Sequence, residues 1–156
     1  MKIASRILFL AFAIALTGLS SCKKGSDPAP DPAAEQLKKL SKTWKVSTVT
    51  QGGTDVTASY TAFTLTVSGT AGAASFGYVT TNRPALSPWP SSGSWNFGTT
   101  IATDIVRDKA TADELPITYS VSDTQLQLSF TFNGNGYQGS RVNNVGGNWI
   151  FTLTPQ

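Results

Sequence analysis

A chain of 156 residues with only 13 % charged side chains and abundant threonine, serine, asparagine and glycine has the length of one domain and the composition of an exported β protein. It contains no histidine and a single cysteine, which excludes Ser-His-Asp and Cys-His catalysis, histidine-ligated zinc, thiolate metal clusters and an internal disulfide. Without Lys2, Arg6, Lys23 and Lys24, eight basic side chains remain against nine acidic ones. We therefore expect no nucleic-acid partner, no metal and no cofactor.

Residues 1–21 are predicted to be a secretory signal peptide. The cationic residues Lys2 and Arg6 precede an apolar run over residues 7–16, which is too short to span a bilayer. The stretch Leu19-Ser20-Ser21-Cys22 then resembles the bacterial lipobox, an aliphatic residue and two small residues before a cysteine. The resemblance implies cleavage before Cys22, a diacylglycerol on its sulfur and an acyl chain on its new amine. An ordinary signal peptide with a chance cysteine is the alternative.

A lipid at Cys22 would hold the protein on a membrane. Each buried CH₂ contributes about 0.8 kcal/mol, so two or three acyl chains suffice for stable anchoring. Lys23, and not an aspartate, follows the cysteine. By resemblance to lipoprotein sorting rules, this favours the outer membrane, with the periplasmic and the cell-surface side both open.

Residues 22–35 are predicted to be a tether between the lipid and the domain. Three prolines within residues 25–34 favour an extended chain of about 3.1 Å per residue. Residues 35–41 can form two helical turns with Leu37 and Leu40 on one side. We interpret this segment as a short cap packed on the β domain of residues 36–156.

From Trp44 onward, apolar residues recur with the period of two that is typical of half-buried strands. The pattern is clearest in residues 125–132, where Leu126, Leu128 and Phe130 alternate with polar side chains. About eight strands are expected, over residues 44–50, 63–68, 75–80, 93–98, 101–107, 117–122, 125–132 and 149–153. Strands with one wet face and short connections predict antiparallel pairing, and a closed sheet of eight strands leaves no exposed edge.

Three tryptophan motifs resemble those of small lipocalin-like domains, which are common in lipoproteins of Bacteroidota. They are Lys-Thr-Trp-Lys-Val at residues 42–46, Gly-Ser-Trp-Asn-Phe at residues 93–97 and Gly-Asn-Trp-Ile-Phe at residues 147–151. The resemblance implies an all-β, lipocalin-like antiparallel barrel in which Trp44 closes one end and Arg141 stacks on it. Lys42 stands where the lipocalin signature has glycine. A β-sandwich is the alternative, although this chain lacks the disulfide that usually joins its sheets.

Two further patterns resemble catalytic motifs. Residues 134–139 match the nucleotide-binding spacing G-x-G-x-x-G, but no helix pattern follows, so we interpret them as a glycine-rich loop. Asp104, Asp108, Asp113 and Glu114 lie close in sequence, and two carboxylates can catalyse glycoside hydrolysis. Nothing in their surroundings indicates a raised pKa, so we expect a solvated turn and no enzyme.

The most suggestive candidate for binding is the segment of residues 82–92, in which Pro88 and Pro90 flank Trp89. An exposed Trp89 would stack on a sugar ring or a partner side chain. The favoured alternative is that Trp89 folds back and closes one mouth of the barrel. Candidate interior aromatic residues are Trp44, Phe63, Tyr78, Trp95, Phe130 and Trp149, and so many rings argue for a filled barrel with at most a modest pocket at one mouth.

These observations predict a membrane-anchored, non-enzymatic envelope lipoprotein whose barrel binds a small apolar ligand. A glycan-binding module and an envelope protein-interaction module are the alternatives, and the protein is expected to be a monomer. The candidate ligand-binding residues are Trp89, Trp95, Tyr78 and Tyr137. Trp44, Arg141 and Trp149 are expected to be structural.

Overall fold

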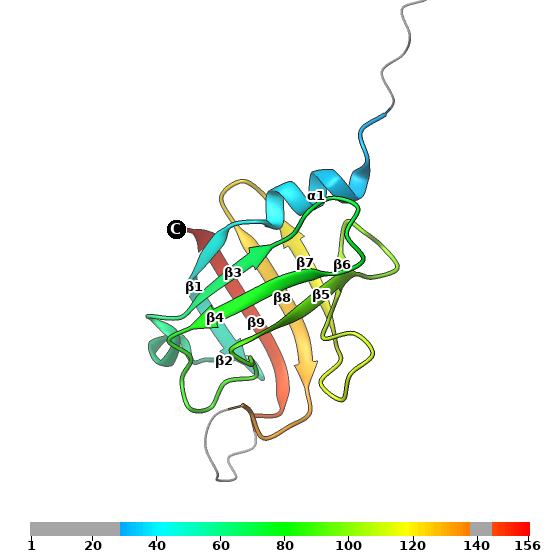
Figure 1. Ribbon diagram of the computed structural model, residues 1–156. Helices are drawn as coiled ribbons and strands as arrows, with labels where there is room; N and C mark the ends of the chain where they lie inside the picture. Colours follow the sequence, from blue (N-terminus) through cyan, green and yellow to red (C-terminus); the bar gives the residue numbers. More distant parts are fainter. Residues whose placement is uncertain (1–28, 138–144) are drawn as a thin grey trace, which may run out of the picture.

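The computed structural model describes residues 29–137 and 145–156, which form an all-β, lipocalin-like barrel (Figure 1). Strand β1 (Thr43–Gln51) pairs on one side with β3 (Thr64–Ser68) and on the other with β9 (Gly147–Pro155). This double pairing closes the sheet into a barrel of eight strands, so the barrel prediction is confirmed and the sandwich alternative is wrong. The predicted signal peptide, Cys22 and Arg141 lie outside the described residues.

Every pair of neighbouring strands in the barrel is antiparallel, in the order β1-β3-β4-β5-β6-β7-β8-β9. The remaining barrel strands are β4 (Phe76–Thr81), β5 (Ser92–Phe97), β6 (Asp104–Arg107), β7 (Leu115–Val121) and β8 (Leu126–Phe132). Burial alternates strictly along β8, which confirms the period of two read from the sequence. The sequence did not predict the short β2 (Thr54–Asp55), which pairs with β1, or the 3₁₀ helix η1 (Thr57–Tyr60).

One end of the barrel is closed by helix α1 (Pro32–Leu40) (Figure 1). The helix begins at Pro32, within the expected tether, because Asp31 caps it and proline suits a first helical position. Its buried residues Leu37 and Leu40 face the barrel, as the cap interpretation predicts. The indole Nε1 of Trp44 donates a hydrogen bond of 2.9 Å to the carbonyl of Leu40, which joins the helix to the first strand.

The barrel interior is packed with aromatic side chains. Trp44 and Trp149 are almost completely buried, and Tyr60, Phe63 and Phe151 form a cluster of ring contacts with centroids 5.3–5.8 Å apart. Such contacts stabilise the core beyond the burial of apolar area alone. Within the described residues, the structure contains no helix that is both long and apolar enough to cross a membrane.

Candidate functional site

Four connections lie at the barrel mouth, the end opposite α1 (Figure 1). Residues 52–63 join β1 to β3 and contain η1. Residues 82–91, here called the mouth loop, join β4 to β5. Residues 108–114 join β6 to β7, and residues 133–137 follow β8. Asn82 begins the mouth loop with a φ of 51°, a left-handed conformation that asparagine adopts more readily than most residues. The chain therefore turns sharply there and runs back over the barrel.

The mouth loop is fixed by hydrogen bonds to five consecutive backbone carbonyls. The donors are the Tyr60 hydroxyl to Leu86 (3.0 Å), the Tyr137 amide to Ser87 (3.3 Å), Arg107 Nη1 to Pro88 (2.7 Å), Arg83 Nη1 to Trp89 (3.0 Å) and the Thr80 hydroxyl to Pro90 (2.6 Å). These donors come from η1, from β4, from β6, from the mouth loop itself and from the segment that follows β8. The backbone of a buried loop must find such partners, and here they hold the loop inside the mouth.

Trp89 fills the space beneath the mouth loop. Its side chain is 3 % exposed, and its ring lies edge-on to Tyr78 (5.7 Å), Phe130 (5.7 Å) and Phe151 (6.0 Å). This placement confirms the interpretation in which Trp89 folds back and closes the mouth. The exposed platform that would stack on a sugar is wrong for Trp89, because the ring has no free face.

Arg107 is the charged centre of the mouth and is 1 % exposed. Its Nε lies 3.3 Å from Oδ2 of Asp108, and its Nη2 donates to the Tyr137 hydroxyl at 2.9 Å. Its guanidinium carbon also lies 5.3 Å from the ring centroid of Trp89 and 5.4 Å from that of Tyr137. A buried arginine is tolerated only when its charge is matched, and here Asp108 matches it although Nε makes no hydrogen bond to a described residue.

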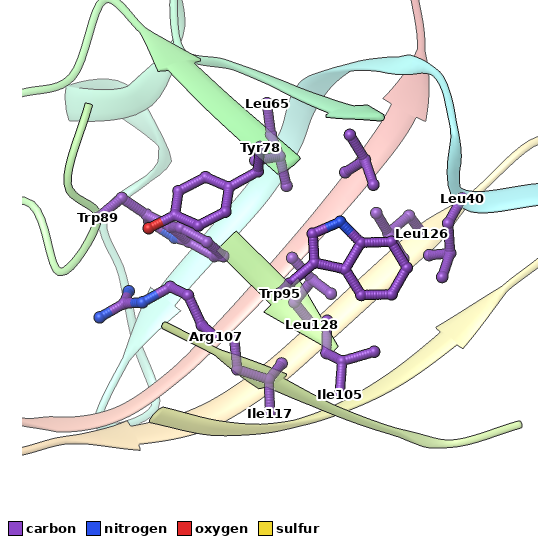
Figure 2. A pocket seen from close by; sticks show the side chains of 11 residues that line it. Leu40, Leu65, Tyr78, Trp89, Trp95, Ile105, Arg107, Ile117, Leu126 and Leu128 are labelled. Atoms are coloured by element: carbon purple, nitrogen blue, oxygen red, sulfur yellow. The ribbon is translucent and has the colours of Figure 1, made fainter. Parts of the chain in front are cut away.

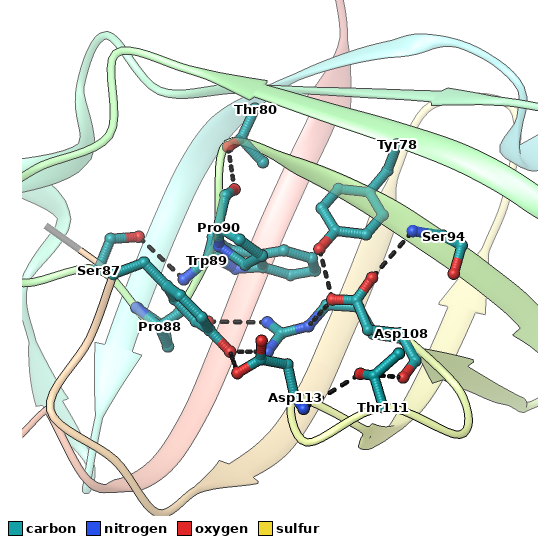
Figure 3. A network of polar contacts seen from close by, with 12 residues as sticks. Tyr78, Thr80, Ser87, Pro88, Trp89, Pro90, Ser94, Asp108, Thr111 and Asp113 are labelled. Atoms are coloured by element: carbon teal, nitrogen blue, oxygen red, sulfur yellow. Dashed lines mark hydrogen bonds and ion pairs between the residues drawn. The ribbon is translucent and has the colours of Figure 1, made fainter.

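Asp108 connects the arginine to the surrounding strands (Figure 3). Its carboxylate accepts hydrogen bonds from the Tyr78 hydroxyl (2.8 Å) and from the Ser94 amide (2.9 Å). Burial and the hydrogen bond to Asp108 both raise the pKa of Tyr78, so the phenol stays protonated and remains a donor. Gly93 makes room for this contact, because a Cβ there would collide with the Asp108 carboxylate and the Tyr78 hydroxyl.

A small cavity lies under Trp89 in the middle of the barrel (Figure 2). Tyr78, Trp89 and Arg107 gather on one side of it, and Leu40 and Leu126 lie on the other. Its volume is about 30 Å³, whereas a single water needs roughly 10–15 Å³. With Trp89 in place, the cavity therefore holds nothing larger than water.

A second hollow lies outside the cavity, at the rim of the mouth. It measures about 380 Å³, is open to solvent, and has polar and apolar residues in its walls. Asp113, Asn133, Asn135 and Tyr137 line it, and Arg107 lies at its base. The Tyr137 hydroxyl donates to Oδ1 of Asp113 at 3.1 Å. Burial is the main cause that raises the pKa of Tyr137 to about 12.

The structure brings together most of the predicted ligand-binding residues. Tyr78, Trp89 and Trp95 line the same small cavity, while Tyr137 lies on the other side of Arg107 and lines the rim hollow. Trp44 and Trp149 are buried in the core, as expected of structural residues. The remaining walls of the small cavity are formed by Leu65, Val67, Ile105, Ile117 and Leu128.

The four clustered carboxylates are not one group. Asp108 is buried in the arginine network, and Asp113 contacts Tyr137 at the rim. Asp104 lies at the opposite end of β6, where it accepts from the Thr100 amide, and Glu114 accepts from the Ala110 amide. The expectation of a solvated turn is therefore wrong for Asp108, because it compensates a buried charge.

Sequence analysis missed Arg107 as the centre of the site. The signal was present, because Ile105 points inward and the period of two places Arg107 on the same face. Within the described residues, no group of three or more potential metal ligands occurs. Comparison of the chain with protein-family models, with curated proteins and with solved structures finds no match.

Proposed function

We propose that this protein is a non-enzymatic binding protein of the cell envelope, held on the outer membrane by a lipid at Cys22, whose barrel binds a small apolar ligand at its mouth. The observation that carries the proposal is that a loop side chain, Trp89, packs into the mouth end of the interior among the strand side chains Phe130 and Phe151. A loop can leave its place without breaking the barrel, because the strand ladders do not depend on it.

The space that Trp89 occupies has the size and the character of a ligand site. A buried tryptophan covers about 150–250 Å² of surface, and its withdrawal would join its own volume to the cavity below. The walls of that chamber are mostly aliphatic and aromatic. Eight-stranded barrels of this kind are wide enough to hold one small ligand.

The closed mouth also has a local energetic weakness. The indole Nε1 of Trp89 is buried and has no hydrogen-bond partner among the residues that the structure describes. A buried donor without a partner costs about 1–3 kcal/mol. This cost offsets part of the stabilisation that burial of the ring provides, so the closed state is easier to displace.

The contacts of the four clustered carboxylates support a non-enzymatic function. Asp108 neutralises Arg107, and Asp104 and Glu114 accept backbone hydrogen bonds in turns. Asp113 is exposed and accepts from Tyr137. None of these four carboxylates is paired with another across a cleft in the way that acid–base catalysis requires.

Native mass spectrometry of the full protein, purified in mild detergent from its own membranes, tests the ligand. We expect an apolar molecule to be released from the barrel on unfolding and to increase the melting temperature when it is added back. A protein that carries no molecule and whose melting temperature responds to no apolar compound contradicts ligand binding. The anchor is tested separately, because Cys22→Ser should move the protein from the detergent phase to the aqueous phase.

A glycan-binding module is the second candidate, and the rim hollow favours it. Amides, carboxylates and a half-buried tyrosine are the groups that sugars contact in proteins, and Asn133, Asn135, Asp113 and Tyr137 line the hollow. We expect oligosaccharides, if they bind, to shift amide resonances at the rim and not in the barrel. Tyr137→Ala should abolish such shifts, and Thr118→Ala on β7 should leave them unchanged.

A further inference from the structure

The proposed ligand site is occupied in this structure by two residues of the chain itself, and their chemistry describes what can replace them. Trp89 supplies a flat apolar ring, which three aromatic rings contact edge-on. Pro88 supplies a carbonyl oxygen, which accepts a hydrogen bond of 2.7 Å from Nη1 of the buried Arg107 (Figure 3). Both groups leave together when the mouth loop moves.

Departure of the mouth loop leaves Arg107 with a further unmet donor, in addition to Nε, which has no hydrogen-bond partner among the described residues. Its Nη2 remains bonded to the Tyr137 hydroxyl, and its Nε remains beside Asp108. Its Nη1 loses the Pro88 carbonyl, and the guanidinium also loses the ring of Trp89, whose centroid lies 5.3 Å away. A buried charged donor without an acceptor is strongly unfavourable. A ligand that fills only the ring space would leave this donor unpaired.

The charge of Arg107 is already balanced, which decides what kind of acceptor fits. The Asp108 carboxylate lies 3.3 Å from Nε, and the exposed carboxylate of Asp113 lies beyond the Tyr137 hydroxyl. A carboxylate at the position of the Pro88 carbonyl would place a further negative charge beside Asp108 in a low-dielectric interior. An uncharged carbonyl would restore the lost hydrogen bond without this repulsion.

We infer that the barrel selects ligands that combine a flat apolar ring system with an uncharged carbonyl acceptor, and that Pro88 and Trp89 occupy the ligand's place in the closed state. This inference rests on the proposed function, because it specifies the ligand of the same site. It assigns the ring to the space among Tyr78, Phe130 and Phe151, and the carbonyl to Nη1 of Arg107.

Three indole compounds separate the two halves of the inference. N-acetyltryptamine reproduces the Trp89 side chain and the Pro88 carbonyl with the same atoms between them. Indole-3-butyrate places a carboxylate carbon at the same position, and 3-butylindole carries the ring without an acceptor. Calorimetric titration of the full chain measures the affinity of each. We expect N-acetyltryptamine to bind on the order of tenfold more tightly than either of the other compounds, because it alone satisfies the charged donor without repulsion.

Two variants test whether the mouth loop is the competitor. Replacing Pro88, Trp89 and Pro90 together by glycine keeps the loop length and its backbone carbonyls but removes its ring and its stiffness, so the ring space becomes vacant. All affinities should then rise about tenfold or more, because the ligand no longer displaces the Trp89 ring. Leu153→Ala is the matched control, because it opens space in the core while leaving the mouth loop intact, and it should bind as the wild type does.

The results distinguish failure of the carbonyl inference from failure of the proposed ligand site. If the three compounds bind with equal affinity, or if indole-3-butyrate binds best, the inference on the carbonyl is overturned and the proposed apolar site stands. If Leu153→Ala gains the affinity and the loop variant does not, the site is not at the mouth. If no compound binds either the wild type or the loop variant, ring binding at this site fails altogether. Should the loop variant fail to fold by circular dichroism, the order of the three wild-type affinities decides.

Discussion

The buried pair of Arg107 and Asp108 allows a sharp prediction about what holds the barrel mouth together. Asp108→Asn removes the negative charge but keeps the shape of the side chain. Asparagine also tolerates the left-handed backbone of this position, where φ is 50°. The amide oxygen can still accept one of the hydrogen bonds that Tyr78 and Ser94 donate. The other donor loses its acceptor, but the larger consequence is the loss of the negative charge beside Arg107.

The magnitude follows from the burial of the arginine. The Arg107 side chain is 1 % exposed, and its Nε lies 3.3 Å from the carboxylate that is lost. Removing one partner of a buried ion pair costs about 3–5 kcal/mol, because the other charge stays buried without compensation. For a domain of this size, the melting temperature should fall by on the order of 10–20 °C. Urea unfolding followed by tryptophan fluorescence measures the free energy directly.

Two further variants make this prediction refutable. Asp123→Asn changes an exposed carboxylate in the turn between β7 and β8 and should alter the stability by less than about 0.5 kcal/mol. Arg107→Met combined with Asp108→Asn removes both charges and should be more stable than Asp108→Asn alone. If Asp108→Asn matched Asp123→Asn, or if the double variant lost stability additively, the reasoning would be refuted.

Three other predictions concern the close approach at β5, the closed end and the tyrosines. Gly93→Ala should lower the melting temperature more than Gly77→Ala, because its Cβ collides with the ion-pair carboxylate, whereas a Cβ at Gly77 meets one serine hydroxyl at 3.2 Å; equal effects contradict this. Trp44→Phe removes the indole hydrogen bond to α1, so amide exchange in α1 should accelerate and stability should fall by about 1–3 kcal/mol, and unchanged exchange would argue against it. Burial is the largest cause that raises the pKa of every tyrosine above its usual value near 10. Keeping these phenols protonated therefore stabilises the fold fully below pH 10, and this stabilisation is lost as the pH rises toward 12. An ultraviolet titration that shows tyrosinate near pH 10 in the folded protein would contradict this. The affected residues are Tyr60, Tyr119 and Tyr137, with pKa values of about 12, and Tyr78.

Much of the barrel could be predicted because its signal is local. Alternation of apolar and polar residues marks a strand wherever one face meets the core, and β8 follows the alternation of residues 125–132 closely. Element boundaries were less predictable. The strand expected over residues 101–107 begins only at Asp104, because the preceding residues form a hydrogen-bonded turn in which the Asp104 amide donates to the Thr100 carbonyl. Turn geometry of this kind competes with strand propensity and leaves little trace in a hydrophobic pattern.

The candidate site was predictable only in part. The prolines around Trp89 marked the mouth loop, and the general burial of tryptophan favoured its folding inward. Arg107 and Asp108 were each ordinary charged residues in the sequence, and such residues are solvated in most proteins. Their role depends on Pro88, Tyr78 and Tyr137, which are far from them along the chain. A buried charge is stable only where oppositely charged and hydrogen-bonding partners surround it. Those partners come together only when the barrel closes.

The amino-acid sequence by itself determined which side chains of the clearly alternating strands β3, β7, β8 and β9 face inward, because strand periodicity is set by the backbone and needs no distant partner. It also determined that a stiff, tryptophan-bearing loop would join two central strands. Only the tertiary structure decided that this loop enters the mouth and that a buried arginine bonds its carbonyl. The physical reason is the pairing of β1 with β9: closure of the sheet brings remote donors and acceptors into one dry space, where each must find a partner.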